Sequence, residues 1–178
     1  MAQSPIPVHY HISDYEQWEG DWELIDGIPV AMTPAPVLEH QRLVMLLTMA
    51  LEESLSDCEN CRVYPEAEWR VSDDTVLRPD GVVICYPPGK YLDKPPALIL
   101  EVLSPGTARL DREYKKERYA REGVKHYLLA DPATRQVEAF TFKDGQYEKR
   151  GETNSETLAF DLGPCTAHID FKRVFSRL

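Results

Sequence analysis

The sequence predicts a mixed α/β fold (an α+β arrangement), in which a mixed β-sheet is flanked by helices. Apolar runs of strand length, rich in Val, Ile and Leu, recur through the chain. Two of them, residues 97–103 and 124–130, enclose a helical stretch, which is typical of parallel strands joined by a right-handed crossover. Asp26-Gly27 and Asp144-Gly145 are turn signals that predict antiparallel hairpins, the first of them an extra N-terminal hairpin.

Length and composition favour one domain over residues 1–178. A chain of 178 residues can bury about 70% of its extended surface, which is enough for a hydrophobic core. No apolar run approaches the roughly 18 residues that a membrane helix needs. Residues 1–7 lack the basic start and the apolar stretch of a signal peptide. We therefore expect a cytoplasmic location and no membrane partner.

The first third of the chain contains the predicted hairpin between two helices. Residues 13–18 begin with a Ser-x-x-Glu capping box and predict a short helix. The hairpin strands are residues 22–25 and 28–32, and two prolines in residues 33–36 break the chain after them. A longer helix over residues 38–56 has an apolar stripe at helical spacing, formed by Leu43, Leu46, Leu47, Ala50 and Leu51.

The rest of the chain alternates strands and one further helix. We expect strands over residues 62–71, 76–86, 97–103 and 124–130, a helix over 108–121 that ends at Gly123, a hairpin over 136–142 and 146–149, and one or two short strands or a helical turn after 157.

The net charge of −10 argues against strong non-specific affinity for DNA. Its distribution is uneven, because residues 1–60 hold 11 acidic side chains and a single basic one, whereas the remainder is neutral. Residues 109–125 hold seven basic and four acidic side chains. This mixed helix is typical of a solvated, salt-bridged surface with at most weak attraction for phosphate.

The four cysteines are Cys58, Cys61, Cys85 and Cys165. Cys58 and Cys61 have the C-x-x-C spacing that suits zinc or a redox pair. A closed zinc site needs four ligands, and no second C-x-x-C pair occurs. We therefore expect free thiols in a reducing compartment, with Cys85 as a small core side chain.

Glu101 lies inside an apolar run, flanked by Leu98, Ile99, Leu100, Val102 and Leu103. An unpaired carboxylate in such a strand would cost several kcal/mol. A cation, a bound metal or a raised pKa must compensate for it. A buried salt bridge to an arginine is one interpretation. The following helix offers another, through Asp111, Lys115, Lys116 and Tyr119.

Asp80 lies 21 positions earlier, at the start of another apolar strand. Taken alone, it reads as a turn or strand-start aspartate that Arg78 could pair with. Two carboxylates on adjacent strands, however, can hold Mg²⁺, which needs few protein ligands. Such an ion lowers the pKa of a bound water and stabilises charge on phosphate oxygens, and a nearby lysine assists. The pair predicts a divalent-metal site for phosphodiester cleavage.

Pro79-Asp80 and Glu101-Val102-Leu103 resemble the Asp … Glu-x-Lys core of the PD-(D/E)XK nuclease superfamily, and most closely the Uma-type restriction-endonuclease-like family. The shared pattern comprises Glu23-Leu24-Ile25-Asp26-Gly27 after an aromatic residue, the Glu39-His40 helix start, Arg78-Pro79-Asp80, Glu101-Val102-Leu103-Ser104-Pro105, Asp111-Arg112, Lys115, Tyr119-Ala120, Gly123-Val124 and Asp131-Pro132.

The resemblance implies a restriction-endonuclease-like core and assigns roles to its motif residues. Asp80 and Glu101 would bind Mg²⁺ or Mn²⁺, helped by the Val102 carbonyl. Leu103 stands where the superfamily has its lysine, and in this family Lys115 would take that role.

Other residues would support this centre. Asp111, one helical turn before Lys115, would orient that lysine, although an exposed i, i+4 ion pair is the alternative. An acid of the first long helix often completes the metal site in the superfamily. Glu39 is that candidate here, His40 is its rival as a ligand or proton carrier, and Glu23 is a supporting residue.

The function implied is that of a Mg²⁺- or Mn²⁺-dependent DNA endonuclease, in which water attacks phosphorus in line and leaves a 3′-hydroxyl. One alternative is a catalytically inactive nuclease-fold module that binds nucleic acid or protein, which the acidic first third favours. Another is a different metal-dependent hydrolase or a structural protein with a salt-bridged Glu101. A homodimer would suit the cutting of both strands.

Overall fold

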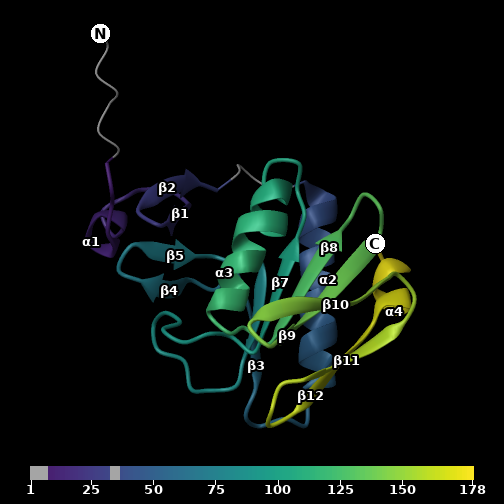
Figure 1. The fold of residues 1–178 in the computed structure, drawn as a ribbon. Coiled ribbons are helices and arrows are strands. Elements are labelled where there is room, and N and C mark those ends of the chain that lie inside the picture. Colours follow the sequence, from purple (N-terminus) through teal and green to yellow (C-terminus); the bar gives the residue numbers. More distant parts are fainter. Residues whose placement is uncertain (1–7, 33–36) are drawn as a thin grey trace.

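The computed structural model describes residues 8–32 and 37–178 (Figure 1). The predicted break at residues 33–36 and the segment 1–7 lie outside these ranges. The main sheet has six strands in the order β10-β9-β8-β7-β6-β3. Their bounds are β3 Arg62–Pro65, β6 Gly81–Ile84, β7 Leu98–Val102, β8 His126–Asp131, β9 Gln136–Lys143 and β10 Gln146–Thr153.

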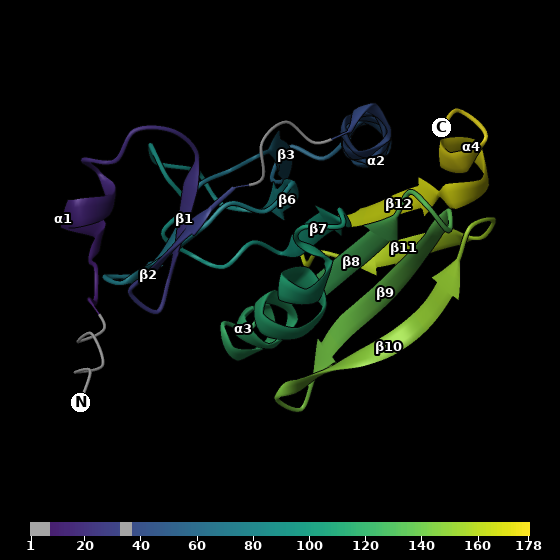
Figure 2. The ribbon, with the colours of Figure 1, turned by 90° about the horizontal axis from the view of Figure 1, so that it is seen from above.

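The sheet is mixed, as predicted. Strands β7 and β8 are parallel, and the other neighbours in the sheet are antiparallel. Helix α2 (Leu38–Ser54) lies against one face and helix α3 (Lys116–Arg121) against the other. Seen from above, the sheet runs between the two helices (Figure 2). The fold is therefore the expected mixed sheet flanked by helices.

Alternation along the strands divides the core in two. Leu98, Leu100 and Val102 of β7 pack on the α2 side, whereas Ile99 packs on the α3 side with Tyr119 and Tyr127. Side chains of a strand point alternately to opposite faces. Glu101 therefore shares the α3 face with Ile99, and this parity brings it beneath the helix that carries Lys115.

A second sheet contains the predicted hairpin. Strands β1 (Trp22–Ile25) and β2 (Ile28–Ala31) form the hairpin, and β5 (Thr75–Leu77) and β4 (Trp69–Ser72) extend it in the order β2-β1-β5-β4. The turn residues Asp26 and Gly27 both have positive φ, the conformation that an Asp-Gly hairpin turn requires. Figures 1 and 2 show this sheet beside one end of the main sheet.

Two long strands predicted from the sequence are each divided between the two sheets. The predicted strand 62–71 is β3 and β4, which separate near Glu66, a residue with φ of 48°. The predicted strand 76–86 is β5 and β6, which separate at Arg78-Pro79-Asp80. Proline has no amide hydrogen to donate to a ladder, so pairing ends there. The prediction of single strands was wrong at both places.

The predicted helix 108–121 is a π-helical turn, η1 (Leu110–Lys115), followed by α3. The helix ends at Gly123, whose φ of 79° is the conformation expected of a residue that follows a helix. The first helix is shorter than predicted: α1 covers Ile12–Tyr15, and the backbone N–H of His11 donates to the Asp14 carboxylate at 2.9 Å.

The C-terminal segment forms a third unit. Strands β11 (Thr157–Asp161) and β12 (Thr166–Asp170) make a hairpin, and α4 (Phe171–Phe175) follows. Phe160, Ile169 and Phe171 belong to the same core as the α2 stripe. Among the helices of the described residues, none is long and apolar enough to cross a membrane.

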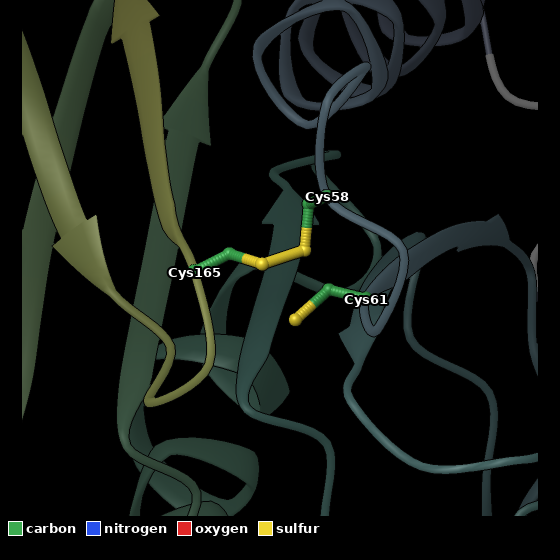
Figure 3. Close-up of side chains that lie close together, drawn as sticks. All are labelled: Cys58, Cys61 and Cys165. Atoms are coloured by element: carbon green, nitrogen blue, oxygen red, sulfur yellow. A yellow bond between two sulfur atoms is a disulfide. The ribbon is translucent and has the colours of Figure 1, made fainter.

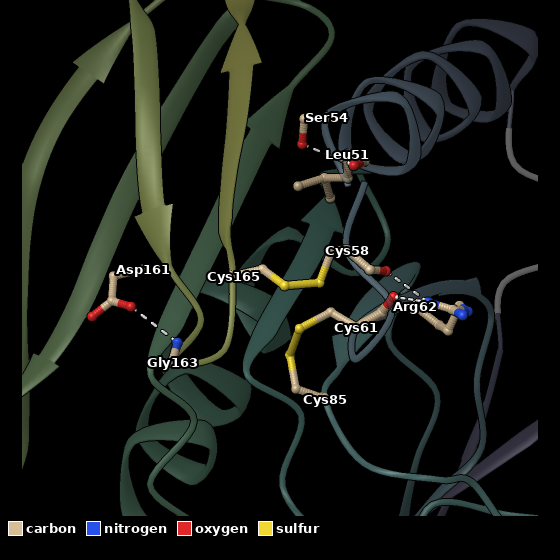
Figure 4. Close-up of a disulfide and its surroundings, with 9 residues drawn as sticks. All are labelled: Leu51, Ser54, Cys58, Cys61, Arg62, Cys85, Asp161, Gly163 and Cys165. Carbon is tan, nitrogen blue, oxygen red and sulfur yellow. Dashed lines mark hydrogen bonds between the residues drawn. A yellow bond between two sulfur atoms is a disulfide. The ribbon is translucent and has the colours of Figure 1, made fainter. Parts of the chain in front are cut away.

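The prediction of free thiols was wrong. Cys58 is disulfide-bonded to Cys165, and Cys61 is disulfide-bonded to Cys85 (Figure 4). The register that pairs Arg62 with Ile84 in β3 and β6 brings Cys61 beside Cys85, the residues that flank this pair. A pairing between segments so far apart in sequence could not be read from the C-x-x-C spacing.

Candidate active site

Asp80 and Glu101 lie side by side at the end of the β6–β7 pair. The register that pairs Gly81 with Leu100 brings Asp80 opposite Glu101. The backbone N–H of Asp80 donates to Glu101 Oε2 at 3.2 Å, and the backbone N–H of Val102 donates to Asp80 Oδ2 at 2.7 Å. These reciprocal hydrogen bonds fix both carboxylates relative to the sheet.

Glu101 is 2% exposed and receives two further donors from the helix above it. The Tyr119 hydroxyl donates to Glu101 Oε1 at 2.6 Å, and Lys115 Nζ donates to the same oxygen at 3.2 Å. Groups of the chain itself therefore compensate this buried carboxylate: the ammonium of Lys115, the phenol of Tyr119 and the backbone amide of Asp80.

Lys115 is the centre of a buried ion cluster. Its Nζ lies 3.0 Å from Glu23 Oε1, 3.2 Å from Glu101 Oε1 and 3.5 Å from Asp111 Oδ1. Lys115, Glu23 and Asp111 are each less than 5% exposed. Glu23, from β1 of the N-terminal hairpin, is therefore a closer partner of the lysine than Asp111, the residue expected to orient it.

Three of the four helix residues considered from the sequence point to the site. Asp111, Lys115 and Tyr119 occupy one face of the η1–α3 segment and are buried. Lys116 points elsewhere, because its Nζ lies 3.9 Å from the centre of the Phe140 ring. The spacing of four residues therefore identified the face that lies over the sheet.

Lys115 is held as an ammonium. Burial alone would lower its pKa, but the carboxylates of Glu101, Glu23 and Asp111 raise it well above the usual value for lysine. Burial and the neighbouring Glu101 likewise raise the pKa of Tyr119 well above its usual value, so its phenol keeps its proton and remains a donor.

The carboxylates of the cluster outnumber its cation. Burial raises the pKa of Glu101 well above its usual value, and Asp111, Asp80 and Glu23 raise it further against the opposing effect of Lys115. Burial also raises the pKa of Asp111. Four carboxylates and one lysine leave an excess of negative charge, which a divalent cation would relieve.

Of the two candidates on the first long helix, α2, His40 lies in the site and Glu39 does not. His40 is 7% exposed, and its Nε2 is 3.4 Å from Asp80 Oδ2. Glu39 is exposed on α2. Burial lowers the pKa of His40, but the contact with the Asp80 carboxylate, the Val102 carbonyl and the charge of Asp111 together raise it more, so its net pKa is raised. His40 Nδ1 has no hydrogen-bond partner among the described residues.

Arg78 does not pair with Asp80, contrary to the simplest interpretation of the sequence. Its guanidinium Nη1 donates to Asp21 at 2.7 Å, while its backbone N–H donates to Glu23 Oε1 at 2.7 Å. Arg78 therefore holds the Glu23 carboxylate through the main chain. This contact and the backbone hydrogen bonds between Asp80 and the β7 residues could not be predicted from the sequence, because nearly every residue type supplies a backbone N–H.

The cluster faces a cavity of about 610 Å³. Asp80, Glu101, Asp111, Lys115 and His40 contribute to its lining. Carboxylate oxygens are the ligands that Mg²⁺ and Mn²⁺ prefer. Buried Asp111 Oδ1 also has no hydrogen-bond partner among the described residues. The oxygen-rich donor set, its charge excess and this oxygen, whose ion pair with Lys115 is long at 3.5 Å, fit a hard divalent cation.

The mixed sheet flanked by helices is a restriction-endonuclease-like core. The chain belongs to the Uma2 family, described as "Putative restriction endonuclease", whose pattern matches residues 12–164. The resemblance stated from the motifs is thereby confirmed. No curated protein matches the sequence.

Solved structures agree with the fold. The chain is similar to the crystal structure of "a putative nuclease belonging to DUF820" from Anabaena variabilis, with a TM-score of 0.77 and 16% identity over 94% of this chain and 98% of that one. A DrdV–DNA complex aligns with 63% of this chain and 12% of its own, at 15% identity and a TM-score of 0.32, which is too low to support an argument.

Proposed function

We propose that the protein is a Mg²⁺- or Mn²⁺-dependent endonuclease that hydrolyses phosphodiester bonds in DNA. The observation that carries the proposal is the buried cluster of Glu23, Glu101 and Asp111 around the ammonium of Lys115, with half-buried Asp80 beside Glu101, at the wall of a cavity. Such a cluster is costly to bury as a purely structural device. Membership of a nuclease-type family supports the same function.

Asp80 and Glu101 are the residues that would hold the metal, with help from the Val102 carbonyl. The bound ion would supply a water of lowered pKa and stabilise charge on the phosphate oxygens. The Val102 and Asp80 amides fix the two carboxylates in advance, so that little reorganisation is needed.

Lys115 would hold the attacking water or stabilise the charge that develops on the phosphate. Its ammonium stays protonated because of the surrounding carboxylates, and Glu23 and Asp111 keep it directed at the site. His40, whose Nε2 lies 3.4 Å from Asp80 Oδ2, is the residue through which a proton could enter or leave at Nε2. Glu39, which is exposed, has no part in this arrangement.

Nicking of supercoiled plasmid DNA in the presence of Mn²⁺ or Mg²⁺ tests the proposal. Wild-type protein should nick, Glu101→Gln should lose activity by about 10²-fold or more, and Lys115→Ala should lose a comparable amount. Lys116→Ala is the matched control, since its side chain points away to Phe140, and it should retain activity. Activity unchanged in both Glu101→Gln and Lys115→Ala would mean that the site is misplaced.

A catalytically inactive binding module is the second candidate. The acidic first 60 residues favour it, because their net charge of −10 repels phosphate. DNA bound without cleavage in the presence of either metal, by wild type and Glu101→Gln alike, would support this module and exclude the endonuclease.

A further inference from the structure

All four cysteines of the chain meet at one place, and none of them belongs to the carboxylate cluster. Cys58 and Cys61 lie in the connection between α2 and β3, Cys85 follows β6, and Cys165 lies in the turn between β11 and β12. The sulfurs of Cys58, Cys61 and Cys165 are within 4.8 Å of one another, and Cys85 is bonded to Cys61. Figure 3 shows the Cys61 sulfur beside the Cys58–Cys165 bond.

We propose that, when reduced, Cys58, Cys61, Cys85 and Cys165 form a structural tetrathiolate Zn²⁺ site, and that the two disulfides are the oxidised state of the same four sulfurs. Two disulfides that act as independent cross-links have no need to be adjacent. A tetrahedral zinc site does require adjacency, since Zn–S bonds of about 2.3 Å separate its sulfurs by roughly 3.8 Å.

The ligand set matches what zinc requires. Cys58 and Cys61 supply the C-x-x-C pair. The sequence has no second such pair, but the fold brings Cys85 and Cys165 to the same place as the third and fourth ligands. All four side chains pack against the α2-side core, and Cys61 is 1% exposed. Closed surroundings of this kind are typical of a structural, rather than a catalytic, zinc site.

The backbone around the cysteines is preorganised. Arg62 Nη1 donates to the carbonyls of Cys58 at 2.9 Å and Cys61 at 2.7 Å, which holds the two ends of the C-x-x-C turn (Figure 4). Leu162 N–H donates to the Cys165 carbonyl at 2.9 Å and fixes the other turn. The Arg62 cation also offsets part of the negative charge of four thiolates.

A hollow of about 400 Å³ adjoins the cysteines, and its lining includes Cys58, Cys61, Arg62, Asp57 and Glu59. A dithiol reductant or a metal ion can therefore approach from this side, and acidic side chains attract the cation.

The disulfide state converts to the zinc-bound state by reduction followed by metal binding. Two molecules of a dithiol reductant, each oxidised to its own disulfide, reduce the two protein disulfides to four thiols. Zn²⁺ binding then releases the four thiol protons and forms four Zn–S bonds. The compartment in which the protein resides determines which state is populated, since thiols persist only where reductants maintain them. In both states the cluster ties the β11–β12 turn to α2 and the main sheet.

The test is metal binding by the full-length protein purified with a dithiol reductant. Wild type should bind one Zn²⁺ at the cysteines, and Co²⁺ in its place should give intense thiolate-to-cobalt charge-transfer absorption, which metal held by carboxylates does not give. Cys85→Ser and Cys165→Ser should each lose this thiolate absorption, although each removes a different disulfide. Glu101→Gln, which alters only the carboxylate cluster, should keep zinc and the cobalt spectrum.

Reduced wild type that stays free of zinc at equimolar Zn²⁺, or that binds Co²⁺ without thiolate absorption, would overturn the proposal. Thiolate-to-cobalt absorption that stays undiminished in both serine variants would overturn it as well, because either variant lacks one required ligand. Circular dichroism of each variant verifies folding, and the cobalt spectrum of the wild type decides the question even if a variant does not fold.

Discussion

Each residue of the carboxylate cluster is explained by the partner it contacts, and Tyr119 is the most informative case. Its hydroxyl donates to buried Glu101, whereas the hydroxyl of equally buried Tyr127 donates to the backbone carbonyl of Asp111 at 3.0 Å. Lys115 contacts the same Glu101 oxygen, and a hydrogen bond within such a charged pair contributes about 1.5–3 kcal/mol, whereas a bond between neutral groups contributes about 1 kcal/mol.

Tyr119→Phe should therefore lower the free energy of unfolding more than Tyr127→Phe does, by about 1 kcal/mol. Urea denaturation of both variants measures the difference. Equal losses would show that the charge of the Lys115–Glu101 pair contributes nothing to this hydrogen bond.

The residues of the site were only partly predictable. Asp80, Glu101 and Lys115 were named from the sequence, and they contact one another directly or through an adjoining amide. Glu39 and His40 could not be separated, because neighbours on a helix point about 100° apart and only one can face the sheet. The position of the sheet, which a sequence pattern does not contain, determines that His40 is the residue that faces the cavity.

His126 gives a pH dependence that is separate from the site. It is 3% exposed, and its ring Nε2 is hydrogen-bonded to the Asp161 carbonyl oxygen at 2.9 Å. Burial lowers its pKa below the ordinary value of 6.5. A depressed folded pKa means that the unfolded chain binds the proton more readily. The contribution of His126 is therefore complete above about pH 6.5 and is lost as the pH falls through the folded pKa.

We expect the free energy of unfolding of the wild type to decrease between pH 7 and pH 5 more steeply than that of His126→Asn, which carries no titrating ring. Chemical denaturation at several pH values gives both curves. Parallel curves for the two proteins would contradict this role of His126.

At the level of elements, the η1–α3 segment places two neighbouring lysines in different surroundings. Lys115 points into the carboxylate cluster, whereas Lys116 lies over the Phe140 ring. Lys115→Met leaves Glu23, Glu101 and Asp111 buried without their cation, which should lower the free energy of unfolding by about 3–5 kcal/mol.

Lys116→Met is the matched control, since it removes only a half-buried cation above the Phe140 ring and should lower that free energy by about 1 kcal/mol or less. Thermal unfolding of both variants tests the difference. A Lys115→Met protein as stable as Lys116→Met would contradict the ion cluster.

The elements themselves followed the sequence where local signals were strong. The Asp-Gly turns, the Gly123 helix end and the parallel β7–β8 pair are as predicted. Strand ends at Glu66 and at Arg78-Pro79-Asp80 were missed, because apolar periodicity continues across them while the partner strand changes from one sheet to the other. Pairing partners are a tertiary property.

At the level of the whole molecule, the site is assembled from segments that no local pattern joins. The N-terminal hairpin contributes Glu23, the main sheet contributes Asp80 and Glu101, and the crossover contributes Asp111 and Lys115. The family resemblance, rather than periodicity, linked these segments before the fold was known. The gathering of the four cysteines had no such support and emerged only from the fold.

The claim that this assembly is a divalent-metal centre is tested most directly by calorimetric titration of Mn²⁺ into the folded protein. We expect the wild type to bind Mn²⁺ and Glu101→Gln to bind it at least about tenfold more weakly, because one carboxylate ligand becomes an amide. Lys116→Ala should bind it as the wild type does. Absence of Mn²⁺ uptake by the wild type, or identical uptake by Glu101→Gln, would contradict the claim.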